Sequence, residues 1–546
     1  MTSKFFRYLT FISAYIFLAF APRGDRYFEI SKNLEIFSSV YKEINNLYVK
    51  EINPHHLMRT AIDSMLSSLD PYTNYLSENE VENFRTSNTG KYAGIGALTK
   101  QIDNKFFVTM VYEDFPAFKS GLKIGDEIIK IDDVDISNMS NDDAVNLMHG
   151  QINTTVRLTV KRYGLDKPLD IDFSRQKVKV KVVPYSGMVS SIGYIRLTDF
   201  MDNASLEVEN ALNSLLATGA KGIILDLRNN PGGLVEEAVN ICNLFIDKHL
   251  LVVSTRGKEA ESGKNFITTQ NPINTTIPLI VLINRESASA SEIVAGTLQD
   301  YDRAVIAGEK SFGKGLVQLS TPLAYNSQIK ITTAKYYTPS GRCIQVLDYS
   351  HRREDGSVGA VPDSIRKSFK TTRGRIVYDG GGIDPDLKIP QNRFNGITKT
   401  LIQKGCFLQY ANMYVFKNQS IPPAKKFYIT DGEYSDFVTF IKSQNIQFNT
   451  SSDSIFSEIV NISKLENDYA DIKFLLDSLQ VELSKNNGID IILDKSQIKL
   501  QLEKEIVSRY FFEKGVIEVE LENDIAIQKS IELLSNYSQY SKILHY

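Results

Sequence analysis

The stretch GIILDLRNNPGG, residues 222–233, indicates the fold class of the largest part of this 546-residue chain. Residues 222–227 are almost wholly apolar, as in a strand of a parallel sheet that is covered on both faces. Residues 228–233 form a glycine-rich turn, and turns at the carboxyl ends of such strands are where α/β sheets hold their sites. The simpler alternative is a tight connection from a strand to a helix. Either interpretation predicts an α/β domain around this stretch.

Apolar runs and amphipathic stretches alternate on both sides of this strand. Strand-like runs occupy residues 192–197, 279–283 and 304–307. Helical periodicity marks residues 204–216, 235–245 and the segment that starts at 291. Such alternation is typical of an α/β core. We assign residues 175–395 to this domain.

At roughly 150 residues per domain, a chain of 546 residues would hold about 3.6 domains. We therefore expect three smaller parts beside the α/β domain. Residues 28–87 repeat apolar side chains at helical spacing and predict a helical N-terminal domain. Residues 88–165 combine short strands with one or two helices, which predicts a small α+β or barrel-like module. Residues 396–546 show helical apolar stripes and predict a mainly helical C-terminal domain of open role.

The N-terminus resembles an export signal. Lys4 and Arg7 precede residues 8–21, which carry no charge. This run is shorter than the roughly 20 residues of a bilayer span, but it suits the apolar core of a signal peptide that ends in an A-x-A site at 19–21. We therefore expect residues 1–21 to be a signal peptide or, if uncleaved, an anchor that holds the protein at the membrane through residues 8–21. Both alternatives place the protein in the periplasm or cell envelope.

Composition excludes several classes of protein and site. The 62 basic and 65 acidic residues give a formal charge of −3, so no nucleic-acid partner is expected. Three cysteines are too few for a disulfide framework in a chain of this length. None of the six histidines has a partner at zinc-ligand spacing, so we expect no metal and no other cofactor.

Residues 308–315, GEKSFGKG, nearly match the phosphate-binding loop G-x-x-x-x-G-K-[ST]. The last position is Gly315, so the hydroxyl that would hold Mg²⁺ is missing. Helix formers do not follow the loop either. We therefore disfavour nucleotide binding.

Residues 287–292, SASASE, lie between an apolar strand and a helix. A serine there meets the free N–H groups and the positive end of the helix dipole, which suits a nucleophile with an oxyanion hole. The commoner role for such a serine is helix capping, and we expect Ser291 to be the N-cap.

A serine nucleophile needs a base, and lysine can serve where burial lowers its pKa. Lys314 is the candidate, because Gly313 and Gly315 beside it let backbone pack closely. The alternative is an ordinary surface lysine.

Eight short motifs follow one another along the chain, and any one of them alone is weak. They are residues 69–76 (LDPYTNYL), 92–96 (YAGIG), 121–126 (GLKIGD), 225–233 (LDLRNNPGG), 287–292 (SASASE), 312–318 (FGKGLVQ), 337–342 (YTPSGR) and 382–386 (GIDPD). In this order they resemble the C-terminal processing peptidases, also called tail-specific proteases. These are Ser-Lys serine endopeptidases that contain a PDZ domain. The resemblance runs from about residue 28 to residue 389.

The resemblance implies a catalytic role for three side chains. Ser289, the middle serine of SASASE, matches the nucleophile of the family, and Lys314 matches its general base. Gln318 matches the residue that orients the lysine. The family therefore implies an acyl-enzyme mechanism at these positions.

The resemblance also implies two sets of backbone donors. The oxyanion donors are the N–H of Ala290 and that of Gly232 or Gly233, with the choice between the glycines open. Residues 88–165 are the PDZ domain, whose Gly94-Ile95-Gly96-Ala97 turn would hold the terminal carboxylate of a substrate while its tail adds as a strand.

These inferences predict a multidomain α/β and α+β protein with an N-terminal helical segment, a PDZ domain, an α/β Ser-Lys protease core and a helical C-terminal domain. The predicted function is a serine endopeptidase that cleaves exported or envelope proteins near their C-termini. The rival is a non-catalytic PDZ scaffold that binds such tails. Loss of Ser289 or Lys314 would mark a scaffold, and both are present. Assembly into a homo-oligomer through the helical domains stays open.

Overall fold

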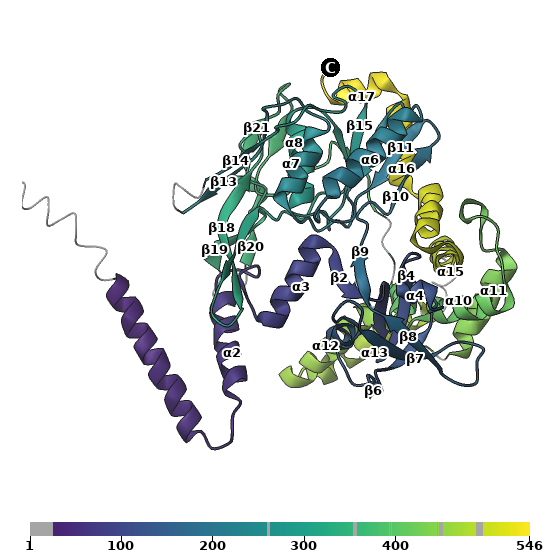
Figure 1. The fold of residues 1–546 in the computed structure, drawn as a ribbon. Coiled ribbons are helices and arrows are strands. Elements are labelled where there is room, and N and C mark those ends of the chain that lie inside the picture. The colour runs from purple at the N-terminus through teal and green to yellow at the C-terminus, as the bar shows by residue number, and fades with distance from the viewer. Residues whose placement is uncertain are drawn as a thin grey trace, which may run out of the picture. The chain divides into compact units, whose positions relative to one another are not determined.

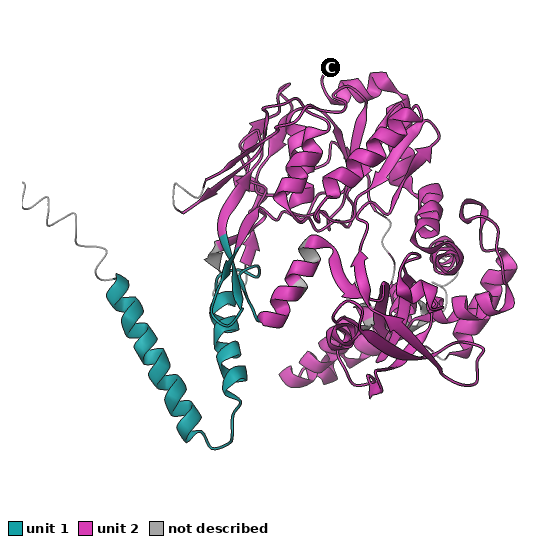
Figure 2. Cartoon of the chain, in the orientation of Figure 1, with its two compact units in different colours: residues 1–77, 320–332 teal, residues 78–319, 333–546 magenta. Residues whose placement is uncertain are grey.

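The structure is a computed structural model that describes residues 26–258, 263–352, 358–391, 394, 396–444, 446, 451–486 and 495–546. The chain divides into two compact units, coloured separately in Figure 2. The first comprises residues 1–77 and 320–332, and the second comprises residues 78–319 and 333–546. Each unit is described by itself.

The first unit is mainly helical. It contains a helix at residues 26–47, α2 (Pro54–Ser67) and β1 (Asn74–Leu76). The Asn53 side chain accepts a hydrogen bond from the His56 N–H and caps α2, whose first residue is proline. β1 pairs antiparallel with residues 328–330 at the start of β18 (Gln328–Tyr337). The predicted N-terminal helical segment is thus confirmed.

The second unit begins with α3 (Glu78–Thr89) and a small α+β module (Figure 1). Its sheet has the order β3-β4-β5-β7-β8, with β6 paired to β5. The strands are β3 (Ala97–Ile102), β4 (Lys105–Val111), β5 (Glu127–Ile131), β6 (Val134–Asp135), β7 (Thr155–Lys161) and β8 (Leu169–Ser174). Two helices, α4 (Pro116–Lys119) and α5 (Asn141–Met148), accompany the sheet. β3 is an edge strand, and β2 (Lys91–Gly94) before it pairs with β9 (Gln176–Lys179).

The α/β core is built on a six-stranded sheet of order β10-β11-β12-β15-β16-β23. The strands are β10 (Tyr185–Val189), β11 (Ile192–Arg196), β12 (Ile223–Asp226), β15 (Leu279–Ile283), β16 (Val305–Gly308) and β23 (Leu387–Lys388). Only β10 runs antiparallel to its neighbour. The carboxyl ends of the five parallel strands therefore lie along one edge.

Helices cover both faces of this sheet (Figure 1). α6 (Ala204–Ala217), α7 (Val235–Asn243) and α8 (Ala290–Asp300) share a buried cluster with Leu225, Val281 and Ile306. Their strand neighbours Ile224 and Ile280 face the other way, onto α16 (Ile525–Ser535) and α17 (Tyr537–Ile543). Burial on both faces explains why β12 and β15 are continuous apolar runs.

A second, antiparallel sheet of the core was not predicted. In the second unit, residues 334–337 of β18 pair with β13 (Leu251–Gly257), which pairs with β14 (Asn265–Ile267). Further short strands are β17 (Leu316–Pro322), β19 (Leu347–Arg352), β20 (Val358–Ala360), β21 (Ser368–Lys370) and β22 (Ile376–Tyr378). Many of these strands are half exposed, so they lack the apolar runs that identify buried strands.

The C-terminal part is helical, as predicted. It comprises α9 (Gly396–Gln403), α10 (Cys406–Lys417), α11 (Asp431–Ser443), α12 (Ser451–Glu466), α13 (Tyr469–Asn486) and α15 (Lys495–Asn523), followed by α16 and α17. α15 is kinked at Phe512, where φ is 52°. The first half of α15 packs with α9, α10 and α11, whereas α16 and α17 pack on the six-stranded sheet.

Within the described residues, no helix has the length and apolar character needed to cross a bilayer. The predicted signal peptide or anchor, residues 1–21, lies outside the described residues.

Candidate active site

Ser289 lies in a sharp turn between β15 and α8, at the carboxyl edge of the sheet. Its φ of 54° and ψ of −112° are unusual for a residue with a side chain, and such strain is typical of functional turns. Ser287 stabilises the turn, because its hydroxyl donates to the Leu227 carbonyl at 2.8 Å and accepts the Asn284 N–H at 2.9 Å. The turn is thereby tied to the end of β12.

The prediction that Ser291 caps the helix is wrong. α8 begins at Ala290, so Ser289 is the N-cap residue and Ser291 lies inside the first turn. Ser291 is buried, and its hydroxyl donates to the Asn230 carbonyl at 2.9 Å. Its hydroxyl therefore joins the helix to the glycine-rich turn 228–233.

Glu292 brings the backbones of Ser289 and Lys314 together. One of its oxygens, Oε2, accepts the N–H groups of Ser289 and Lys314, each at 2.9 Å. The other, Oε1, accepts the Ser311 hydroxyl and the Gly313 N–H, each at 2.6 Å. Glu292 is fully buried; burial raises the pKa of its carboxyl, and these four donors oppose that rise. The candidate nucleophile and base are thus anchored to one carboxylate.

The loop that carries Lys314 is closely packed. The Val346 N–H donates to the Gly313 carbonyl at 3.0 Å, and the Gln345 side chain accepts the Gly315 N–H at 2.8 Å. The Lys314 side chain is half-buried. The loop continues into the strand β17, which places half-buried Gln318 four residues beyond Lys314. A phosphate-binding loop is followed by a helix, whereas this loop is followed by the strand β17.

A substitution at Gly313 would show how much the close packing around Lys314 contributes to stability and turnover. Its φ is +87°, and an added Cβ would lie 1.9 Å from a Val346 methyl carbon. We expect Gly313→Ala to destabilise the protein by about 2 to 5 kcal/mol, since left-handed strain and overpacking add. Displacement of Lys314 should lower turnover about 100-fold. Thermal unfolding and a peptidase assay measure the two effects.

Gly374→Ala is the matched control. Gly374 has a φ of +85°, but an added Cβ would meet nothing within 4 Å. It should therefore show only the strain, about 1 to 2 kcal/mol, with turnover unchanged. Equal effects of the two substitutions on turnover would contradict the importance of packing around Lys314.

The glycine-rich turn lies directly against the Ser289 turn. A Cβ on Gly232 would lie 2.8 Å from the Ser289 Cβ and 2.9 Å from the Ala290 nitrogen. The Gly232 N–H itself donates to the Asn230 side chain at 2.9 Å. Within the described residues, no acceptor is found for the N–H groups of Gly233 and Ala290. These two amides are therefore the donors left for a ligand beside Ser289.

Asn230, Glu292 and Tyr336 are functional candidates that sequence reasoning missed. Asn230 is fully buried; its carbonyl accepts the Ala288 N–H and its side chain donates to Leu197. Burial raises the pKa of Tyr336 to about 12, although a side-chain hydrogen bond with Ser289 partly opposes this rise. All three lie within or next to the quoted motifs, but nothing in a motif says which members are buried and paired.

The Gly94-Ile95-Gly96-Ala97 turn, the second candidate site, lies in the α+β module between β2 and β3. The carbonyls of Ile95 and Gly96 accept the N–H groups of Ala117 and Tyr112 at 2.8 and 3.0 Å. In the described part of the chain, the amides of Ile95 and Gly96 have no acceptor. The turn thus presents backbone donors at the start of an edge strand.

Four family models match the chain, in an order that follows the fold. An activating protease CtpB N-terminal domain matches residues 21–80, and a PDZ domain matches residues 86–161. Peptidase family S41 matches residues 191–349, and a probable PDZ-protease C-terminal helical domain matches residues 397–534. The models assign a type to each of the four predicted parts.

Curated relatives point to the same family. The carboxy-terminal-processing protease of Bartonella bacilliformis is 40% identical over 338 residues, which cover 61% of this chain and 75% of that protein. A probable CtpA-like serine protease of Staphylococcus haemolyticus is 37% identical over 306 residues, which cover 56% of this chain and 61% of that protein.

Among solved structures, a photosystem II D1 C-terminal processing protease is 25% identical and covers 65% of this chain and 92% of that one. Its TM-score of 0.35 is too low to support an argument. The family models and the curated relatives agree on one family. The chain belongs to the carboxy-terminal-processing proteases of peptidase family S41, which are serine endopeptidases, and it carries a PDZ domain.

Proposed function

We propose that the protein cleaves exported or envelope proteins near their C-termini through a Ser289–Lys314 dyad and an acyl-enzyme. The observation that carries the proposal is the shared Glu292 oxygen, which accepts the N–H groups of both residues at 2.9 Å. Two residues 25 positions apart in the sequence are held at one buried point. The backbones of the proposed nucleophile and base therefore meet at one carboxylate oxygen.

In the proposed acylation, neutral Lys314 takes the proton from the Ser289 hydroxyl as Oγ attacks the substrate carbonyl carbon. The carbonyl oxygen becomes an oxyanion and accepts hydrogen bonds from the N–H groups of Ala290 and Gly233. We choose Gly233 over Gly232 because the Gly232 N–H already donates to Asn230. The C–N bond then breaks, and Lys314 returns the proton to the leaving amine.

Deacylation repeats the sequence with water. Lys314 takes a proton from the water molecule, whose oxygen attacks the acyl carbon, and the Ser289 oxygen leaves with that proton. Gln318 is proposed to orient Lys314 during both steps. No step requires a metal ion, so a chelator should leave the rate unchanged.

The PDZ module is proposed to bind the substrate tail. β3 is the edge strand of its sheet, so an extended tail has a free strand beside which it can pair. The free amides of Ile95 and Gly96 lie where this strand begins and suit a terminal carboxylate. Export, predicted from residues 1–21, would place the enzyme with periplasmic or envelope substrates.

Rapid-quench mass spectrometry tests the mechanism. The full chain is mixed with a reporter protein whose flexible C-terminal extension ends in an apolar residue, and the reaction is quenched in acid. We expect an acyl adduct on Ser289 in the tryptic peptide 286–303, and none in Lys314→Ala. An adduct on another residue, or cleavage that a chelator abolishes, would contradict the proposal.

A further inference from the structure

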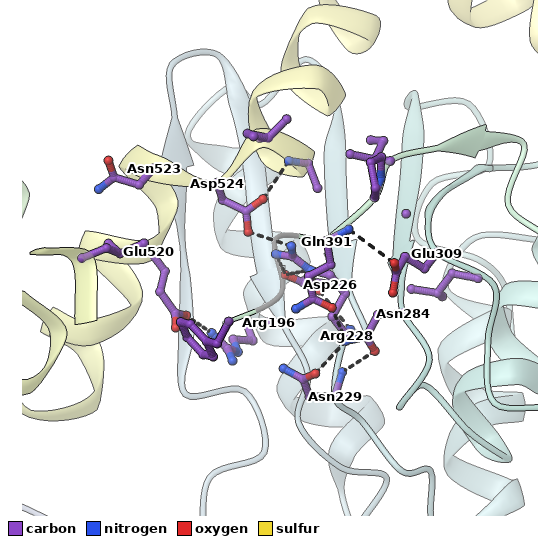
Figure 3. A pocket seen from close by; sticks show the side chains of 18 of the residues that line it. Arg196, Asp226, Arg228, Asn229, Asn284, Glu309, Gln391, Glu520, Asn523 and Asp524 are labelled. Carbon is purple, nitrogen blue, oxygen red and sulfur yellow. Dashed lines mark hydrogen bonds and ion pairs between the residues drawn. The ribbon is translucent and has the colours of Figure 1, made fainter. Parts of the chain in front are cut away.

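The C-terminal helical domain makes a charged contact with the turn that carries Gly232 and Gly233. Asp524, the N-cap residue of α16, accepts a hydrogen bond from Arg228 Nη1 at 2.7 Å (Figure 3). Arg228 is the first residue after β12 and Leu227, and it opens the turn 228–233. The two residues are 296 positions apart in sequence and line a cavity of about 210 Å³.

Arg228 is held from two sides. Its guanidinium binds both oxygens of buried Asp226, with Nε to Oδ1 at 2.9 Å and Nη2 to Oδ2 at 2.6 Å. Nη1 is left for Asp524. Asp226 alone fixes the guanidinium relative to its own strand, whereas Asp524 fixes it relative to a helix of the C-terminal domain. The contact is a charge-assisted hydrogen bond at a partly buried site, where such bonds are strong.

Several contacts tie the residues after Arg228 to the segment 284–290, which carries Ser289. The Asn229 N–H donates to the Asn284 side chain at 2.9 Å, and Asn230 accepts the Ala288 N–H at 3.0 Å. Gly232 then lies against Ser289 and Ala290. A shift of Arg228 would therefore move the amides beside Ser289 without touching Ser289 itself.

We infer that Asp524 is a positioning residue that holds the turn 228–233 in place through Arg228. The C-terminal helical domain thereby affects the rate of acylation. This inference rests on the proposed function and gives residues 396–546 a role in it. Asp524 also caps α16, because Oδ1 accepts the N–H groups of Ala526 and Ile527. One side chain, Asp524, therefore both caps α16 and contacts the arginine at the start of the turn.

Two substitutions separate the positioning role from the capping role. Asp524→Asn and Asp524→Ser both keep a good N-cap. The asparagine can no longer offer a charge to Arg228, and the serine is too short to reach it. We expect both variants to lower kcat for the tailed reporter about tenfold, while KM changes by less than about twofold.

The oxyanion hole itself gives a second readout. A peptidyl boronate that adds to Ser289 forms a tetrahedral boronate, and one of its oxygens lies where the oxyanion forms. Its affinity for both variants should fall about tenfold, in parallel with kcat. Affinity of the PDZ module for a labelled tail peptide should stay unchanged, because Asp524 does not belong to that module.

Glu520→Gln is the matched control. Glu520 lines the same cavity and pairs with Arg196 on β11 and with Lys504, but it does not contact the turn (Figure 3). It should leave kcat and boronate affinity unchanged. If Glu520→Gln lowers them as much as Asp524→Asn does, the effect is general loosening of the domain and the inference is overturned.

Ser289→Ala in the same assay separates failure of this inference from failure of the proposed function. An inactive Ser289→Ala together with fully active Asp524→Asn and Asp524→Ser would overturn the inference alone. An active Ser289→Ala would overturn both.

Discussion

Ser289→Ala and Lys314→Ala are each expected to reduce turnover of a tailed substrate by about four orders of magnitude or more, because each removes a member of a unit that acts together. The double variant should be no worse than either single one, since one missing member already disables the dyad. Steady-state cleavage of the reporter measures all three. Fluorescence polarisation of a labelled tail peptide should show unchanged binding, because the PDZ module is intact.

Lys310→Ala is the control for loss of a lysine. Lys310 lies on the same loop, four residues before Lys314, and its half-exposed side chain pairs with Asp384 at 3.6 Å. Screened pairs of this kind contribute little, so its removal should leave turnover nearly unchanged. Full activity of Ser289→Ala, or a loss on Lys310→Ala equal to that on Lys314→Ala, would contradict the assignment of the dyad.

Glu292→Gln is expected to have the next largest effect, although the two side chains have almost the same shape. The carboxylate accepts four hydrogen bonds, two at each oxygen. An amide nitrogen in place of either oxygen would point its own hydrogens at two donors. We expect a loss of about 3 kcal/mol or more in unfolding free energy, because buried donors are left unpaired.

Turnover of Glu292→Gln should fall by about 100-fold or more, since Ser289 and Lys314 would no longer share an anchor. Thermal unfolding and the peptidase assay measure the two effects. The control is Glu286→Gln, an exposed carboxylate just before the same turn, which should behave like the native protein. Native stability and turnover in Glu292→Gln would show that the shared anchor is unimportant.

The main elements of the fold could be predicted because their apolar periodicity is strong. The strand predicted at residues 279–283 is β15, and the structure gives it the same bounds. The antiparallel sheet of β13, β14 and β18 was missed. Its strands are partly exposed, and β13 pairs with β18 over a long sequence separation, so a local pattern carries little information about them.

At the site, too, some residue roles could be predicted from the sequence, and others depend on the folded structure. A serine in residues 287–292 and Lys314 were candidates because a nucleophile and a base need particular residue types, and the family resemblance then pointed to Ser289 and to the glycines of the turn. Ser291 was misassigned as the cap, because capping depends on where the helix starts and a shift of two residues exchanges the roles. The roles of Asn230, Glu292 and Tyr336 depend on what surrounds them, so no local signal identified them.

By itself the sequence determined the class of the core, the order of its parts and the residues able to do the chemistry. The class and the order follow from periodicity, which is a local property, and the candidate residues follow from side-chain chemistry together with the family resemblance. Only the tertiary structure decided that Glu292 would accept the N–H groups of both Ser289 and Lys314, that the Gly232 amide would donate to Asn230, and that Asp524 would reach Arg228. Those contacts bring distant segments together, and a buried hydrogen bond or ion pair exists only where the folded chain excludes water around both partners.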